Sequence, residues 1–158
     1  MVNIIIFFGS FLTLCFFIYT LFKINIKSNN KKIENSVQPY IVKKYANLKG
    51  EMISYPFIDS EFNQKCFPAK YDFIFCNFGL IILQKDYKPI MTLYNKEAYN
   101  LKIEINKCNL IKHNSYLNRI ELHLTGIGHI TKIKIIVKLN SKETSEEIYK
   151  LINDLVEI

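Results

Sequence analysis

The spacing of hydrophobic positions changes along the chain and divides the sequence into three parts. From Ile4 to Phe22 the residues are apolar except for a few small or weakly polar ones. The next part, up to residue 49, is rich in lysine and asparagine, and from residue 50 apolar residues recur at every second position. These patterns predict a membrane helix, a polar linker and a β-sheet domain, in that order.

The apolar part predicts a transmembrane helix within residues 1–22. Its 19 residues from Ile4 to Phe22, coiled as an α-helix, span about 28 Å, close to the hydrocarbon thickness of a bilayer. Thirteen of them are Ile, Leu or Phe, which together favour insertion by about 4 to 8 kcal/mol. A cleavable signal peptide fits less well, because no basic residue precedes the run and no A-x-A site follows it. A lipoprotein signal would need a small residue before Cys15, where this chain has Leu14. The buried helix of a soluble protein would be shorter or amphipathic.

Residues 23–49 predict a basic juxtamembrane linker, with seven lysines against Glu34. Four lysines lie within about ten residues of the apolar end, where the positive-inside rule operates. We therefore expect these four to contact anionic lipid headgroups at the membrane surface and the rest of the chain to be cytoplasmic: Lys23, Lys27, Lys31 and Lys32. Residues 27–38 are too polar to bury a core and predict a flexible tether. Residues 40–50 favour a short helix.

The period of two from residue 50 onward predicts about seven short antiparallel strands. Asn77 and Gly79 suit a tight turn between two of them, and glycines in residues 125–129 suit the last hairpin turn. The predicted strand segments are residues 51–57, 71–76, 80–84, 89–94, 101–105, 109–113, 118–124 and 130–139. In the last two, apolar Ile120, Leu122, Leu124, Ile133, Ile135, Val137 and Leu139 oppose polar Arg119, Glu121, His123, Lys132, Lys134 and Lys138.

The chain ends in a predicted amphipathic helix. Thr144 and Glu147 have the spacing of a capping box. Apolar residues follow at helical intervals, namely Ile148, Leu151, Ile152, Leu155 and Val156. We expect this helix to cover the open end of a strongly bent sheet, which would also protect strand edges from aggregation.

This order of elements resembles the pleckstrin-homology-like (PH-like) fold, particularly the bacterial PH-like domains, over residues 50–158. The stretches "FIFCNFGLIIL", "LKIEINKCNLIKH" and "SKETSEEIYKLINDLVEI" carry the resemblance. It implies a β-barrel or sandwich capped by a helix, which serves as a scaffold for binding lipids or proteins and is generally not an enzyme. The first hairpin has lysines but no arginine, so specific recognition of inositol phosphates is not expected.

Charge and candidate chemistry narrow the function. Residues 50–158 carry only +1 of the net charge of +7, so a basic patch on the folded part, and with it nucleic-acid binding, is not expected. The row of Lys132, Lys134 and Lys138 is either a solvated strand face or a contact for a partner or anionic lipid. His123 and His129 flank the last hairpin, yet solvated residues are a more common explanation than a metal site. No catalytic, cofactor-binding or metal-binding residue is predicted.

The cysteines fit a reducing compartment. The predicted domain has three cysteines, Cys66, Cys76 and Cys108, and neither their odd number nor their spacing fits a disulfide framework or a zinc site. We therefore expect free, buried thiols.

The favoured function is a single-pass membrane protein whose cytoplasmic PH-like domain binds a protein partner or membrane component near the bilayer. The alternative is an extracytoplasmic β-domain, a structural subunit of an envelope assembly on an uncleaved signal helix. An enzyme, with a deep polar pocket holding Glu121 and His123, comes third.

Overall fold

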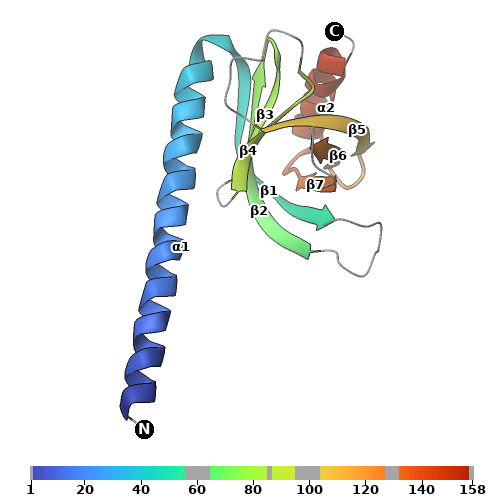
Figure 1. The fold of residues 1–158 in the computed structure, drawn as a ribbon. Coiled ribbons are helices and arrows are strands. Elements are labelled where there is room, and N and C mark those ends of the chain that lie inside the picture. The colour runs from blue at the N-terminus through green and yellow to red at the C-terminus, as the bar shows by residue number, and fades with distance from the viewer. Residues whose placement is uncertain (1, 56–64, 85–86, 95–103, 127–131, 157–158) are drawn as a thin grey trace.

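The computed structural model describes residues 2–55, 65–84, 87–94, 104–126 and 132–156. A long N-terminal helix lies along one flank of a closed barrel of seven strands, and a second helix covers one end of the barrel (Figure 1). The expected class, a mainly β fold with an N-terminal apolar helix and a C-terminal amphipathic helix, is confirmed.

The first helix, α1 (Val2–Val37), continues well beyond the apolar stretch. Ile26, Ile33 and Val37 recur along one side of it and are buried, with exposed fractions of 8%, 8% and 0%. Ile33 and Val37 pack on the outer surface of the barrel in an apolar cluster with Ile74, Cys76, Phe78, Ile81, Leu83 and Met91. The prediction of a flexible tether over residues 27–38 is wrong, because packing on the barrel outweighs the polar composition.

A 3-10 turn (Gln38–Tyr40) leads into β1 (Ile41–Tyr55), which pairs with both β2 and β7. The predicted short helix over residues 40–50 is therefore wrong, and the barrel strands begin within the segment predicted as linker. The register shifts between Tyr45 and Leu48, where Asn47 has a φ of 57°. With this irregularity the inward residues Tyr45, Leu48 and Met52 fall at i, i+3 and i+7, a helical spacing.

The other strands are β2 (Lys65–Cys76), β3 (Gly79–Gln84), β4 (Tyr87–Thr92), β5 (Glu104–Asn114), β6 (Arg119–Gly126) and β7 (Lys132–Lys138). Neighbouring strands are antiparallel except β4 and β5, which meet in a short parallel contact. The β2–β3 hairpin with its turn at Asn77 is as predicted. The segments predicted at 101–105 and 109–113 belong to a single strand, β5, with a bulge between Cys108 and Leu110. Residues 56–57, 101–103 and the predicted turn at 127–129 lie outside the described residues.

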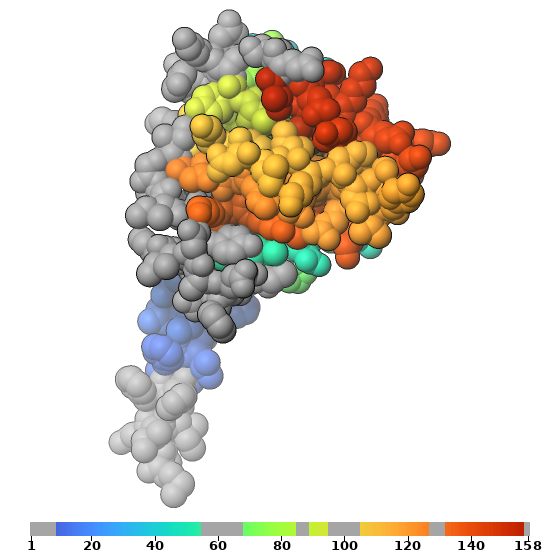
Figure 2. Space-filling view, turned by 90° about the vertical axis from the view of Figure 1, so that its right-hand side faces the viewer, coloured from blue at the N-terminus to red at the C-terminus, as the bar shows by residue number. Residues whose placement is uncertain are grey.

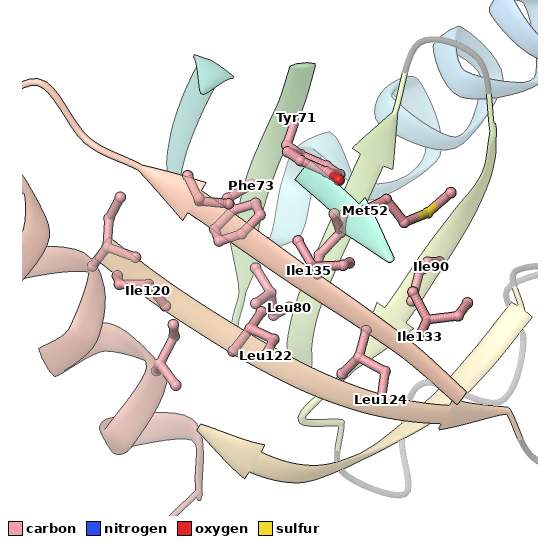
Figure 3. Close-up of a cluster of buried hydrophobic side chains, with 14 of the residues drawn as sticks. Met52, Tyr71, Phe73, Leu80, Ile90, Ile120, Leu122, Leu124, Ile133 and Ile135 are labelled. Carbon is pink, nitrogen blue, oxygen red and sulfur yellow. The ribbon is translucent and has the colours of Figure 1, made fainter. Parts of the chain in front are cut away.

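The barrel is filled by inward-pointing apolar side chains from its strands (Figure 3). Ile120, Leu122 and Leu124 of β6 are at most 1% exposed, and the inward residues of β7 join them, so the predicted alternation of both strands is confirmed. The last helix, α2 (Lys142–Val156), adds Ile148 and Ile152 to this core.

The start of α2 differs from the prediction. Thr144 donates its backbone N–H to Oγ of Ser141 at 3.2 Å, and the two hydroxyl groups lie 2.9 Å apart. Ser141 is therefore the N-cap residue, three residues before the predicted one. The predicted capping box of Thr144 and Glu147 is wrong, and Glu147 instead forms an ion pair with Lys43.

Candidate functional site

The outer surface of the half-barrel formed by β5, β6, β7 and the end of β1 carries a cluster of positive charges. These strands lie on the flank of the barrel opposite α1 (Figure 1) and form a continuous surface below α2 (Figure 2). Their described outward positions hold seven lysine or arginine side chains against two carboxylates, Glu51 and Glu121. We call the seven the basic face: Lys49, Lys107, Lys112, Arg119, Lys132, Lys134 and Lys138.

This face corrects one expectation from the sequence. The net charge of the folded part is nearly zero, but four of its carboxylates lie on α2, away from these strands: Glu143, Glu146, Glu147 and Asp154. Strand alternation sends the lysines of β7 outward, together with Ile136, while Ile133, Ile135 and Val137 turn inward. A balanced total therefore conceals a basic patch on the folded part.

Three cations of the basic face lie side by side in one row across the sheet. Lys138 is directly opposite Lys49 on β1 and Arg119 on β6. Lys49 and Lys138 are exposed, and neither has an acidic partner among the residues that the structure describes. Like charges placed directly opposite one another destabilise a sheet, and of the three cations Arg119 alone has a carboxylate partner among the described residues, Glu121.

Glu121 organises the centre of the basic face. Its side chain is 9% exposed and contacts Nζ of Lys134 at 2.8 Å, Nε2 of His123 at 2.6 Å and the Arg119 guanidinium at 2.9 Å. Burial by itself raises the pKa of Glu121, but the hydrogen bonds from Lys134, His123 and Arg119 outweigh it and lower the pKa to about 2. The carboxylate is therefore ionised at neutral pH and holds three side chains in place.

A hollow of about 380 Å³ opens on this face beside the Glu121 cluster. Its charged and polar lining comes from Lys132, Lys134, His123, Asn109 and Thr125. Asn109 donates from Nδ2 to Oγ1 of Thr125 at 2.6 Å, which ties β5 to β6 at the rim. Two of the three predicted contact lysines thus meet at one hollow, whereas Lys138 belongs to the row described above.

The pocket expected for an enzyme does not take the predicted form in the described part of the chain. His123 lines the hollow, but Glu121 is not part of its lining. His113 bonds through Nε2 to Oγ of Ser145 at 2.8 Å and stacks on Tyr149 at 4.5 Å, so it fastens β5 to α2. His129 lies outside the described residues, and among those described no three His, Cys, Asp or Glu side chains gather as a metal site would require.

The lysines predicted to contact the membrane are spread along the continuous helix α1. Lys23 lies over the Tyr19 ring at 4.9 Å from its centroid, and the other three are exposed. With a rise of about 1.5 Å per residue, Lys27 lies about 8 Å beyond Phe22, and Lys31 and Lys32 about 14 and 15 Å beyond it. The four therefore lie at different heights along α1.

The described thiols are free. Cys15 is exposed on α1, Cys76 is buried and Cys108 is partly buried, and the side chain of Cys66 lies outside the described residues. Burial raises the pKa of both Cys76 and Cys108 to about 11, so both remain protonated thiols at neutral pH.

Sequence reasoning missed several residues of the basic face, namely Lys49, Lys107, Lys112 and Arg119. Lys49 was assigned to the linker, and the others become neighbours only through the register of β5, β6 and β7. Tyr116 and Leu117, in the turn between β5 and β6, were also missed and are 97% and 62% exposed. Two consecutive large apolar residues in a turn were the available signal.

The described part of α1 is long and apolar enough to cross a membrane, and hardly any of that stretch is buried against the rest of the chain. Its exposed apolar side chains include Phe11, Leu12, Leu14, Phe16, Phe17, Ile18, Leu21 and Phe22. Comparisons with protein-family models, with curated proteins and with solved structures found no match for this chain.

Proposed function

We propose that this chain is a single-pass membrane protein whose cytoplasmic, PH-like barrel binds an acidic segment of a partner protein alongside the bilayer. The observation that carries the binding role is the row of Lys49, Lys138 and Arg119, two of which have no acidic partner among the described residues. Three adjacent cations repel one another, and an acidic partner would relieve that repulsion.

The anchor and the fold support the same proposal. The apolar side chains of α1 are exposed to solvent in the isolated chain, an arrangement that a bilayer would stabilise. A closed barrel of seven strands with a C-terminal helix inserted into its core matches the architecture that the PH-like resemblance implies. Such barrels are rigid scaffolds that present binding surfaces, and no catalytic residue is proposed here.

A protein is favoured over other anions by the surroundings of the row. The turn that carries Tyr116 and Leu117 directly follows the last β5–β6 pair, Asn114 with Arg119. Exposed tyrosine and arginine side chains are typical anchors of protein interfaces. The face also lies on the flank opposite α1 (Figure 1), so it points sideways from the anchor. A nucleic acid is less favoured, because the described face offers one arginine and lacks a series of aromatic side chains for base stacking.

Site-specific photo-crosslinking in intact membranes tests the proposal. A photoreactive phenylalanine at Tyr116 should give protein adducts, and the same group at exposed Lys150 of α2 should not. Adducts at Tyr116 should fall at least about tenfold when Lys49→Glu and Lys138→Glu are combined, whereas Lys142→Glu on α2 should leave them unchanged. Adducts to lipid alone, or protein adducts that the double variant retains, would contradict the proposal.

A topology reporter fused after Ile158 tests the compartment separately. A cytoplasmic signal is expected from the lysines that follow the apolar stretch. An extracytoplasmic signal would rule out the cytoplasmic binding module and would favour the structural subunit of an envelope assembly.

A further inference from the structure

A groove between β5 and the end of α2 forms a second hollow, which has only Lys107 in common with the basic face. It has a volume of about 540 Å³, within the range of ligand-binding sites. Its lining is mostly apolar, with Leu93, Tyr94, Cys108, Leu110, Ile111, Leu155 and Val156 around Asn106, Lys107 and Asn109. β5 and the C-terminal end of α2, which border the groove, lie toward the end of the molecule remote from the apolar half of α1 (Figure 1).

A buried side-chain amide in the lining of this groove lacks partners among the residues that the structure describes. Asn106 is fully buried and lines the groove, and neither its Nδ2 nor its Oδ1 has a hydrogen-bond partner in the described part of the chain. Thr92 does not line the groove but precedes the lining residue Leu93; it is also fully buried, and its Oγ1 has no partner among the described residues. The short pairing of β4 with β5 ends at Met91 and Ile105. Thr92 is the next residue of β4, and Asn106 is the next residue of β5. Buried polar groups are almost always satisfied, so unsatisfied atoms at the point where two strands separate indicate a place for a polar group from elsewhere.

We propose that this groove binds an extended, uncharged peptide segment with apolar side chains. A carboxamide has one donating and one accepting end, and the group that complements both is a peptide unit. The lining supplies apolar contacts and contains no carboxylate. Two or three water molecules would fill only about 90 Å³ of the groove, which leaves room for side chains.

The edge of β5 favours a peptide over a small amide. Beyond Ile105 the side of β5 that faces away from β6 has no ladder partner among the residues that the structure describes. A free strand edge offers backbone donors and acceptors to an extended chain, and the adjoining hollows accept its side chains. Burial keeps the Cys108 thiol protonated, so we assign it no nucleophilic role. The proposal for this groove is binding alone.

Calorimetry on the full chain in nanodiscs tests the proposal with a defined probe, acetyl-leucyl-alanyl-leucinamide. Binding should weaken at least about tenfold in Asn106→Leu, which removes two hydrogen bonds, while the unliganded variant should melt a few degrees higher because an unsatisfied amide is gone. Val156→Glu, at an exposed rim position, should weaken binding without a folding risk. The matched control is Val42→Glu, at a position that is 66% exposed against 56% for Val156 but lines no part of the groove.

Three results would overturn this assignment. The first is no heat of binding at about 1 mM peptide, a concentration that detects even weak sites. The second is equal affinity in Asn106→Leu and in the unaltered chain. The third is binding of octanoate but not of the peptide, which would make the occupant an acyl chain. None of these outcomes depends on Lys49 or Lys138, so failure here and failure of the proposed function are distinguishable.

Discussion

Replacing Glu121 with glutamine tests whether one buried carboxylate holds the centre of the basic face together. Burial raises the pKa of Glu121, and the donors on Lys134, His123 and Arg119 lower it further than burial raises it, to about 2 against an ordinary 4.5. That difference corresponds to about 3 kcal/mol in the free energy of unfolding. Because the folded pKa lies below the unfolded one, this stabilisation is complete above about pH 4.5 and is lost as the pH falls toward 2.

Glu121→Gln should therefore change both the stability and its dependence on pH. At pH 7 the variant should be less stable by about 3 kcal/mol, because Lys134, Arg119 and His123 lose the carboxylate that they share. Between pH 5 and pH 2 it should lose correspondingly less stability than the unaltered chain. Urea unfolding of the full chain in a non-ionic detergent, followed by the circular dichroism of the β-sheet, measures both quantities.

The matched control is Glu147→Gln. Glu147 also forms an ion pair, with Lys43, but both side chains are more than two-fifths exposed, so solvent screens their attraction and stability should hardly change. Equal acid slopes in Glu121→Gln and the unaltered chain would refute the reasoning. Such a result would mean that the three contacts of Glu121 do not persist in solution.

Three further substitutions test the fold. Ser141→Ala should lower the free energy of unfolding by about 1 kcal/mol through loss of the α2 N-cap, and Ser141→Asp should retain it; thermal melts distinguish the two. Gly79→Ala should destabilise by about 1 to 3 kcal/mol in urea, because Gly79 has a φ of 153° and a Cβ there would lie 2.9 Å from Cα of Tyr94. Ile33→Asp should free the end of α1 and speed its cleavage by trypsin, whereas Asn35→Asp, at an exposed position, should not.

The sequence predicted best those elements whose side chains follow one period without interruption. In β6 and β7 every second residue enters the core, so alternation alone identified both strands and their inner faces. In β1 an irregularity between Tyr45 and Leu48 changes the spacing of the inward residues, and a strand takes on a helical pattern. The second half of α1 was missed because its helix depends on packing of Ile33 and Val37 against the barrel, which local composition does not record.

The candidate sites were harder to predict than the strands. Alternation placed Lys132, Lys134 and Lys138 on one side of β7, yet their meaning depends on neighbours from other strands. Only the pairing register brings Lys49 opposite Lys138, and a net charge near zero argued against any such patch. Asn106 gave no signal at all, because an asparagine between Ile105 and Lys107 is ordinary in sequence and is exceptional only when burial leaves both polar atoms unpaired among the described residues.

The continuous helix α1 sets the height of each juxtamembrane lysine above the membrane in the proposed topology. In the proposed topology Ile26 is buried at only about 6 Å beyond Phe22 along the helix, so α1 holds the barrel close to the bilayer surface. The headgroup layer extends about 5 to 7 Å beyond the hydrocarbon, so Lys23 and Lys27 lie at headgroup level, and Lys31 and Lys32 lie about one screening length from it, about 8 Å at physiological salt. Attraction to anionic lipid therefore rests on these four lysines, most strongly on the first two, and the seven cations of the basic face, on the opposite flank of the barrel, remain available to a partner.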